Sequence, residues 1–404
     1  MTDIIIIGAG AAGMFCAAEL RRRVPRLGIT ILEAGRKSLA KVAVTGGGRC
    51  NLTNSFEDIR SLREAYPRGE RVIKRAMSQF CVRGTLGWFR SRGVALVLQD
   101  DHCWFPKSQD AMEIVRTLRE AASGAEILLE KKVTGITDNG DCFTVTCGEE
   151  EFCADYVVVT AGGLPAGTTM FDPLNLVMEP SVPSLFTFRI DDSVTQLMGL
   201  VVGKVTAAIP GTKLRADGPL LITDWGMSGP AILRLSSYAA RYLKENGYQA
   251  PLSVNWLNVN DEKAHEIIGG IASANPQKMV ESVHPDAIPS RLWAYLAGKA
   301  GVGGRRWAEV GKTGMNRLCS CLTDDNYRIC GRAKFKDEFV TCGGVGLGNI
   351  DPFTMEAKKH PGLFFAGEVL DIDAITGGFN LQAAWSTAYC AAKSVARKYG
   401  DTSD

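Results

Sequence analysis

Residues 45–54, TGGGRCNLTN, place a cation, a thiol and an amide directly after three glycines. Glycine costs backbone entropy and packs nothing, so three in a row indicate a place where side chains would collide with something. Arg49 is a permanent cation, Cys50 carries a nucleophilic thiol, and Asn51 can bond in two directions. These three residues are the candidates for catalysis, and their types alone assign no role to any of them.

A second chemical motif lies at the amino terminus, where Gly8-x-Gly10-x-x-Gly13 follows the apolar run Ile4–Ile7. In a dinucleotide fingerprint the first glycine permits a tight turn, the second lets a pyrophosphate approach, and the third lets the helix pack on the strand. The helix that begins near Ala11 and Ala12 would direct free N–H groups at the phosphates. The pattern therefore predicts a strand, a phosphate-binding turn and a helix.

The acidic residue that such a site needs is Glu33, which ends a strand-like run twenty residues after Gly13. A carboxylate at this spacing accepts hydrogen bonds from ribose hydroxyls and repels a 2′-phosphate. We expect FAD or NAD here rather than NADP.

Further glycine-bearing segments favour FAD over NAD, because an NAD-dependent dehydrogenase would complete its sheet soon after the fingerprint. They are the strand-like run near Val133, the hairpin signal Asn139-Gly140, the buried strand 156–160 that ends in Ala161-Gly162-Gly163, and the carboxyl-terminal Gly367-Glu368 and Gly377-Gly378 before a helix from about Phe379.

The chain resembles a bacterial flavoprotein family of the glutathione-reductase-like superfamily. That family includes aminoacetone-oxidase-type and NAD(P)/FAD-dependent oxidoreductases and reductases of bile-acid dehydroxylation. The shared motifs are GAGAAG, TGGGRCNLTN, TAGG, SGPAIL at 228–233 and AGEVLDIDAITGGFNLQAAW. The resemblance is dense at both ends of the chain and sparse between them.

The resemblance implies that FAD lies extended between the two ends of the chain. Glu33 would meet the adenosine ribose, Val133 the adenine, and Glu368 the ribityl–phosphate region. The N–H groups that open the helix at Phe379 would face the flavin, where a helix dipole stabilises the negative charge of the reduced ring. The full set of implied FAD contacts is Gly8, Gly10, Ala11, Ala12, Gly13, Glu33, Ala34, Arg36, Lys41, Gly48, Arg49, Cys50, Asn51, Val133, Thr160, Ala161, Gly162, Gly367, Glu368, Gly378, Phe379, Asn380 and Leu381.

The expected fold is α/β, with a Rossmann-like FAD-binding domain built from both termini, residues 1–183 and 346–404. Short β-like runs predict an inserted, barrel-like β-rich part at 184–259 and 324–345. Helical patterning predicts a further inserted part at 260–323.

The composition of the chain gives no reason to expect nucleic acid, a membrane or a metal ion as a partner. The 404 residues carry 46 basic and 44 acidic side chains, so the net charge of +2 gives no electrostatic reason to expect nucleic acid or an anionic membrane. The cysteines form no C-x-x-C and the four histidines are scattered, so no metal site is expected. The apolar stretch Ile4–Ala18 is too short to span a membrane, and a cytoplasmic protein is expected. The oligomeric state cannot be read.

The leading hypothesis is a FAD-dependent oxidoreductase that transfers a hydride between flavin N5 and a small organic substrate. NAD(P)H is a candidate transient electron donor, since no second fingerprint domain follows the first. One alternative is an RNA-modifying flavoprotein, which would need a basic stripe; the longest cationic run, Arg21–Arg23, lies on the first helix. Another is a flavin-bound sensor without turnover.

The sequence also predicts the chemical state of Cys50 and two helix caps. The cysteine after Cys50 is Cys81, so Cys50 is expected to be a flavin neighbour and not half of a redox disulfide. The alternative is a thiol whose pKa is lowered by Arg49, with a covalent or acid–base role. Ser108 and Ser228 are predicted to be N-caps of the helices that follow them.

Overall fold

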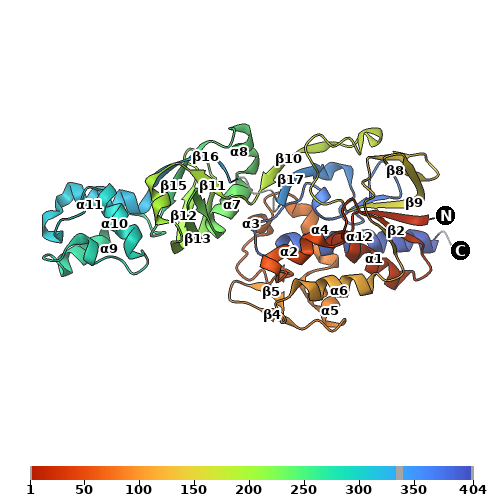
Figure 1. The fold of residues 1–404 in the computed structure, drawn as a ribbon, viewed down its shortest axis with the longest axis horizontal. Coiled ribbons are helices and arrows are strands. Elements are labelled where there is room, and N and C mark those ends of the chain that lie inside the picture. Colours follow the sequence, from red (N-terminus) through yellow and green to blue (C-terminus); the bar gives the residue numbers. More distant parts are fainter. Residues whose placement is uncertain (1, 334–339, 402–404) are drawn as a thin grey trace. The chain divides into compact units, whose positions relative to one another are not determined.

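A computed structural model of the chain describes residues 2–333 and 340–401. The chain forms two compact units, Met1–Val182 with Val340–Asp404, and Pro183–Phe339 (Figure 1). Residues 340–345, which the sequence analysis assigned to the β-rich insertion, form β17 (Val340–Val345) and pair with β10 (Met178–Ser184) instead. The remaining part of the expected strand region, 334–339, lies outside the described residues.

The first unit is built on a mostly parallel sheet. The neighbouring strands are β6 (Glu126–Leu128), β2 (Ile29–Leu32), β1 (Thr2–Ile7), β9 (Glu150–Val159) and β18 (Leu363–Phe365). Ile4, Ile5 and Ile6 of β1 are fully buried, so both faces of this strand are covered. Its sequence is therefore a continuous apolar run and does not alternate between apolar and polar residues. The antiparallel hairpin of β7 (Gly135–Asp138) and β8 (Phe143–Cys147) extends the sheet from β9, and its turn holds Gly140 at φ 89°.

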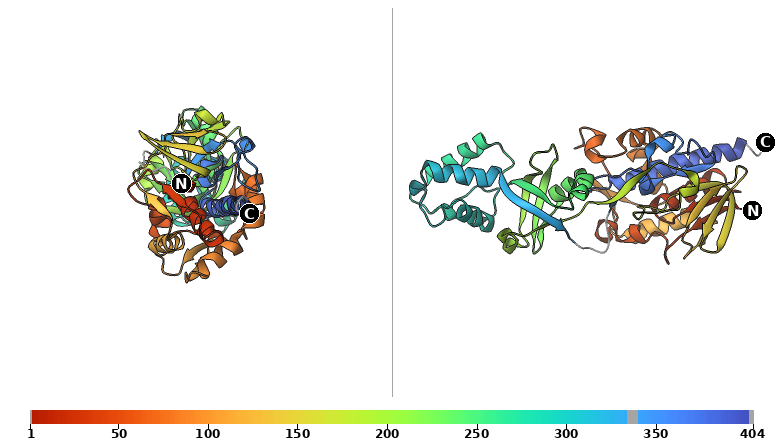
Figure 2. Two further views of the ribbon diagram at one scale, coloured as in Figure 1. Left: turned by 90° about the vertical axis from the view of Figure 1, so that its right-hand side faces the viewer. Right: turned by 90° about the horizontal axis from the view of Figure 1, so that it is seen from above.

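Helices from the two ends of the chain pack together beside this sheet. α1 (Ala11–Arg23) and α12 (Phe379–Asp401) lie side by side (Figure 1 and Figure 2). Small residues such as Ala17 and Ala18 are buried in α1, which allows this close approach. The other elements of this unit are α2 (Ala40–Gly48), α3 (Leu62–Ala65), α4 (Glu70–Gln79), α5 (Val82–Arg90), α6 (Ala111–Ala121), and the small sheet of β3 (Thr53–Asn54), β5 (Cys103–Pro106) and β4 (Leu96–Leu98).

The second unit contains a closed antiparallel barrel with helices inserted between its strands. The barrel order is β11 (Phe188–Ile190), β14 (Gly226–Ser228), β13 (Arg215–Thr223), β12 (Val201–Ala208), β15 (Ala250–Asn255) and β16 (Asp325–Arg332). The helices inserted between β14 and β15 are α7 (Pro230–Tyr238) and α8 (Ala240–Glu245), and those between β15 and β16 are α9 (Asp261–Ala274), α10 (Ser290–Lys299) and α11 (Gly311–Thr323). Trp256 and Trp293 are fully buried in its core.

Three local predictions are wrong. α6 is capped by Asp110, whose side chain accepts from Met112 N, and not by Ser108. α7 has Gly229 at its N-cap, and Ser228 ends β14, where its hydroxyl lies 2.9 Å from that of Thr187. Val133 lies before β7 and not in a strand. In the first two cases the N-cap is a residue one or two positions further on that also favours turns, Asp110 for α6 and Gly229 for α7.

Among the described residues, none of the helices combines the length and the apolar character needed to span a bilayer.

Candidate functional site

The glycine turn between β1 and α1 is open at one position only. Gly8 has a φ of 103°, and a Cβ there would lie 2.5 Å from the Thr160 carbonyl oxygen. A Cβ on Gly13 would lie 1.9 Å from the Gly8 carbonyl oxygen. The packing of the protein itself therefore requires these two glycines. Gly10 differs, because its φ is −83° and a Cβ there would meet no atom within 4 Å. Open space beside a glycine that needs no special φ fits a pyrophosphate close to the backbone.

The start of α1 offers unused backbone donors to such a ligand. Gly10 is the N-cap and has no side chain with which to bond the first turn. The first bond within the helix runs from Met14 N to Gly10 O, so the N–H groups of Ala11, Ala12 and Gly13 precede it. Free N–H groups and the positive end of the helix dipole together favour an anion at this point.

Thr160 supports this turn from the neighbouring strand. Its hydroxyl lies 2.8 Å from Ile7 O and 2.9 Å from Gly8 O, which fixes the path of the turn. Ala161 is exposed beyond it, and Gly162 adopts a φ of 74°. The predicted contacts Ala161 and Gly162 thus lie at the carboxyl end of β9, beside the fingerprint.

Glu33 lies at the expected end of β2 and clamps the turn. Its carboxylate accepts from Ala9 N and Gly35 N, both at 2.7 Å. A carboxylate has about four acceptor positions, so capacity for ribose hydroxyls remains. Lys131 N donates to Glu33 O at 2.8 Å, which brings the segment containing Val133 beside Glu33 and Ala34.

The two predicted cations near this end differ in their partners. Arg36 is exposed and pairs with Glu130 at 3.0 Å. Lys41 Nζ lies 3.5 Å from Glu368 Oε2. Lys41 therefore links the amino-terminal half of the site to the carboxyl-terminal half, whereas Arg36 is turned to a neighbour on the surface.

Glu368 and Gly367 lie where β18 meets α1 and α12. The Glu368 carboxylate also accepts from Thr341 N at 2.9 Å. Gly367 has a φ of 78°, and a Cβ there would lie 2.9 Å from that of Ala12. Its N–H donates to the hydroxyl of Thr387. Glycine at 367 is thus needed for the close approach of the two ends of the chain.

Each of the four residues 51–54 is bonded to the carboxyl-terminal motif. With its amide oriented to satisfy both neighbours, Asn51 donates to Thr53 O at 3.1 Å and accepts from Gly378 N at 3.2 Å. The other bonds are Trp385 Nε1 to Leu52 O (3.0 Å), Thr53 Oγ1 to Gln382 Oε1 (2.7 Å) and Asn54 Nδ2 to Gly377 O (3.1 Å). The two motifs form one structure around the start of α12, which begins at Phe379 as the sequence predicts. Asn380 closes the preceding loop through two bonds with the backbone of Ala374.

The glycine triplet itself adopts left-handed backbone conformations, with φ of 59°, 68° and 81° at Gly46, Gly47 and Gly48. A Cβ on Gly46 would lie 2.9 Å from Asn51 N, whereas nothing lies within 4 Å of one on Gly47 or Gly48. Conformation, rather than collision within the chain, requires the last two glycines. Arg49 is exposed; its Nε donates to Gly46 O at 3.2 Å and its guanidinium lies 4.6 Å from the centre of the Phe105 ring.

Cys50 is fully buried at a φ of 61°. Burial raises the pKa of its thiol to about 12, so the alternative of a pKa lowered by Arg49 is wrong. The thiol is neutral at physiological pH and is a weak nucleophile. All twelve cysteines are free thiols.

A buried ion pair that the sequence does not predict lies beside the start of α12. Arg68 forms two hydrogen bonds with the carboxylate of Asp373, which is fully buried. Burial lowers the pKa of Arg68, but the bonds and charge of Asp373 outweigh that effect and raise it. Nearby, Tyr66 donates to Phe379 O at 2.8 Å. Asp373 stands in the carboxyl-terminal motif, but Arg68 and Tyr66 lie outside the quoted motifs, so the sequence does not reveal the pairing.

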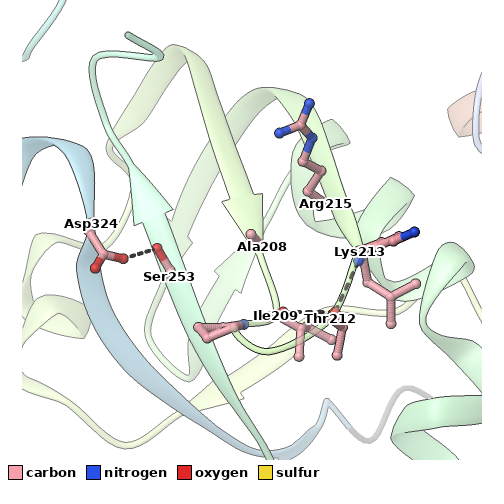
Figure 3. Close-up of a pocket in the computed structure, with 9 residues that line it drawn as sticks. Ala208, Ile209, Thr212, Lys213, Arg215, Ser253 and Asp324 are labelled. Carbon is pink, nitrogen blue, oxygen red and sulfur yellow. Dashed lines mark hydrogen bonds between the residues drawn. The ribbon is translucent and has the colours of Figure 1, made fainter. Parts of the chain in front are cut away.

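A separate hollow of about 620 Å³ lies on the barrel of the second unit. Figure 3 shows Ser253 bonded to Asp324 on one side, and Lys213 and Arg215 on another. The Ser253 hydroxyl donates to the Asp324 carboxylate at 2.5 Å. It contains none of the dinucleotide motifs. In the described part of the chain, no group of His, Cys, Asp and Glu is arranged to hold a metal ion.

These features define a FAD-binding flavoprotein of the Rossmann type. They are a phosphate-binding turn with open space at Gly10, an acidic residue at the end of β2, and a second glycine turn that leads into α12. The chain belongs to the family described as HI0933-like protein Rossmann domain, which it matches over residues 2–394. This match confirms the predicted fold class and the resemblance to a flavoprotein family. Placement within the glutathione-reductase-like superfamily stays a prediction.

Two curated relatives and one solved structure extend the comparison. The chain is 28% identical to the ribosomal RNA dihydrouridine synthase of Escherichia coli K12, over 98% of both chains. It is 25% identical to the 3-dehydro-bile acid delta(4,6)-reductase of Clostridium scindens, over 98% of this chain and all of the relative. The 3-ketosteroid delta1-dehydrogenase of Sterolibacterium denitrificans shares the fold, with a TM-score of 0.50 and 13% identity over 98% of this chain and 99% of that one.

Proposed function

We propose that this protein is a FAD-dependent reductase that saturates a carbon–carbon double bond conjugated to a carbonyl group. The observation that carries the proposal is the chemistry shared by the two curated relatives. One is named for making dihydrouridine, which is uridine saturated at C5–C6, and the other for reducing ring double bonds of a 3-oxo steroid. In both acceptors the double bond is conjugated to a carbonyl, so one reaction type accounts for both names.

The residues around Gly10 and α12 fit FAD. The open Gly10 turn would hold the pyrophosphate, Glu33 the adenosine ribose, and the start of α12 the flavin edge. Reduced FAD supplies a hydride from N5 when it is bound. The positive end of α12, at Phe379, Asn380 and Leu381, would stabilise negative charge at that edge.

Addition of a hydride to the β-carbon of a conjugated carbonyl places negative charge on the carbonyl oxygen, and a proton then goes to the α-carbon. A donor that meets this oxygen lowers the barrier. Of the three catalytic candidates, Asn51 is committed to Thr53 O and Gly378 N, and Cys50 is buried and neutral. Arg49 is exposed and forms no salt bridge among the described residues, so we assign it the contact with substrate.

RNA uracil is the substrate that we favour, because a relative of 28% identity over nearly the whole chain is named for acting on ribosomal RNA. This proposal departs from the expectation, based on net charge, that the protein has no nucleic-acid partner. The second candidate is a small polycyclic enone, for which the steroid-reducing relative is the reason. NAD(P)H stays a candidate electron donor.

Single-turnover reduction tests the proposal. The holoprotein is reduced anaerobically with dithionite and mixed either with an unmodified ribosomal RNA transcript or with a 4-en-3-one steroid. We expect the flavin to be reoxidised by the RNA, with uridine gaining two mass units. If only the steroid reoxidises the flavin, the proposed type of reaction is supported and RNA as the substrate is contradicted. A flavin that stays reduced with both acceptors would contradict the proposal and favour a sensor.

A further inference from the structure

An exposed basic cluster in the helical part of the second unit takes no part in the site described above. We call Lys278, Arg305, Arg306 and Arg317 the basic edge; all four are exposed. Two extended segments that carry three of them are paired antiparallel. Val280 N donates to Arg305 O at 2.9 Å, Trp307 N donates to Lys278 O at 3.0 Å, and Met279 is the bridge partner of Arg306. Residues opposite or diagonal in such a pair lie about 5–8 Å apart.

The fourth cation reaches the same loop from α11. Arg317 Nη1 lies 3.7 Å from the position that a Cβ would take on Gly301, at the start of the loop that leads to Arg305. Gly301 and Gly304 both have a φ of 71°, so the loop turns sharply between α10 and the paired segment. Residues from two chain segments and a helix therefore present cations around one loop.

Within residues 2–333 and 340–401, no salt bridge neutralises the charges of the basic edge. Among the described residues of this unit, salt bridges join Lys263 with Glu266, His265 with Asp261, and Lys299 with Asp325. Two carboxylates that contact the same segment accept from backbone groups instead, Glu281 from Gly304 N and Glu309 from Arg306 N. They reduce the local positive charge without pairing with a guanidinium.

The cationic run noted in the sequence is used differently. Arg22 and Arg23 bond the buried carboxylate of Glu19, and Arg21 donates to Leu27 O. That run holds α1 in place, so it is a poor candidate for a nucleic-acid stripe. The basic edge is the better candidate, because its side chains are exposed. In the described part of the chain, Arg306 donates to Gln277 O, whereas the other three make no bond to a carboxylate or a backbone carbonyl.

The small net charge of the chain conceals a difference between its two units. Residues 183–339 contain 19 Lys and Arg against 15 Asp and Glu, whereas the remainder contains 27 against 29. From 299 to 317 there are five basic residues and one acidic residue. The positive charge is therefore concentrated in the unit that lacks the dinucleotide fingerprint.

We propose that the basic edge is a docking surface for the phosphate backbone of RNA, an inference that rests on the proposed function of reducing uracil in RNA. Guanidinium groups pair with phosphate oxygens in a fixed fork and also stack on bases. Met279, which is 38% exposed beside Arg306, adds an apolar contact suited to the face of a base. A membrane surface would need a larger apolar area than this one side chain.

RNA affinity measured against salt concentration tests the docking surface. The full-length holoprotein is titrated with a fluorescent ribosomal RNA transcript over a series of KCl concentrations. The variant Lys278→Glu/Arg305→Glu/Arg317→Glu should bind at least tenfold more weakly, with the slope of log affinity against log salt smaller by about 2–3, one for each lost phosphate contact. FAD absorbance and melting temperature should stay unchanged, and the corresponding triple alanine variant should show the same direction of effect.

The matched control changes three exposed cations of the first unit, Lys74→Glu/Arg83→Glu/Lys359→Glu, and should retain affinity and slope. An unchanged basic-edge variant, or an equal loss in the control, would overturn the proposal. So would a loss confined to Lys213→Glu/Arg215→Glu in the barrel hollow, or a loss of binding to phosphatidylglycerol vesicles with RNA binding intact. Docking through the edge without saturation of uracil would contradict only the proposed function; saturation of RNA uracil unaffected by the variant would contradict only the docking surface.

Discussion

Asn51 and Gly378, near opposite ends of the chain, are joined by a hydrogen bond of 3.2 Å from the glycine N–H to the asparagine side chain. Trp385, Gln382 and Gly377 bond the three residues that follow Asn51 in the same way. The TGGGRCNLTN segment is therefore a scaffold for the start of α12 as much as a surface for a ligand. Asn51 therefore positions the start of α12, and we propose that Arg49, which is exposed, contacts the substrate.

Two glycines of the fingerprint should respond differently to substitution. Gly10→Val should abolish FAD binding while the apoprotein stays folded, because the space beside Gly10 is open and its φ suits other residues. Gly13→Val should unfold the protein, because its Cβ would lie 1.9 Å from Gly8 O. Flavin absorbance and the melting temperature of the two apoproteins separate the effects. Full FAD occupancy in Gly10→Val would show that the phosphates lie elsewhere.

Cys50 should be chemically silent in the native protein. A thiol whose pKa is raised to about 12 carries almost no thiolate at neutral pH, so alkylation of Cys50 should be at least about a hundredfold slower than that of the exposed Cys153. Mass spectrometry of native protein treated with iodoacetamide measures both rates. Cys50→Ser should keep FAD, and both proteins should take up two electrons; four electrons in the wild type and two in the variant would reveal a dithiol relay.

The Arg68–Asp373 pair should contribute to stability through charge compensation. Asp373→Asn removes the carboxylate that neutralises a largely buried guanidinium, which should lower the free energy of unfolding by about 3–5 kcal/mol. Replacing both residues, as Arg68→Met/Asp373→Leu, should recover much of that loss. Urea unfolding of the wild type, Arg68→Met, Asp373→Leu and the double variant Arg68→Met/Asp373→Leu completes a double-mutant cycle. A loss in the double variant equal to the sum of the two single losses would mean that the pair is not coupled.

Acid should destabilise the protein partly through Glu19. Burial raises the pKa of Glu19, but hydrogen bonds from Arg22 and Trp88 outweigh it, and the folded-state pKa lies below the ordinary value of 4.5. The stabilisation is present above the unfolded-state pKa and is lost as the pH falls through the folded one. Unfolding free energy should therefore fall less steeply below about pH 5 in Glu19→Gln than in the wild type.

The control for Glu19 is Glu130→Gln, which removes an exposed pair with Arg36 and should leave the pH dependence nearly unchanged. Parallel curves for the wild type and Glu19→Gln would show that Glu19 has the same pKa in the folded and unfolded states.

The fold class can be predicted from the sequence because the motifs that indicate it consist of neighbouring residues. The buried run Ile4–Ile7, the glycine spacing and the helix start at Phe379 each depend on neighbouring residues, and the structure has all three. The inserted barrel was also predicted as a class, from short β-like runs. The strand β17 was assigned to the wrong unit because its partner, β10, cannot be recognised from either sequence alone.

The parts of the site that sequence analysis missed depend on burial and on distant partners. Asp373 stands in a quoted motif, but nothing in the sequence around Arg68 indicates that the two residues pair. Arg49 beside Cys50 favours a lowered thiol pKa, and burial reverses that shift. Net charge also does not predict whether the protein binds nucleic acid. It counts the cations that bond Glu19 and the exposed cations of the basic edge equally. Only their surroundings distinguish them.

The identity and amount of the cofactor test the central claim most directly. If both ends of the chain build one FAD site, the purified or reconstituted protein should release one FAD per chain on heating, identified by mass spectrometry and by absorbance. Release of FMN or NAD, or a protein that stays colourless after incubation with FAD, would contradict the account.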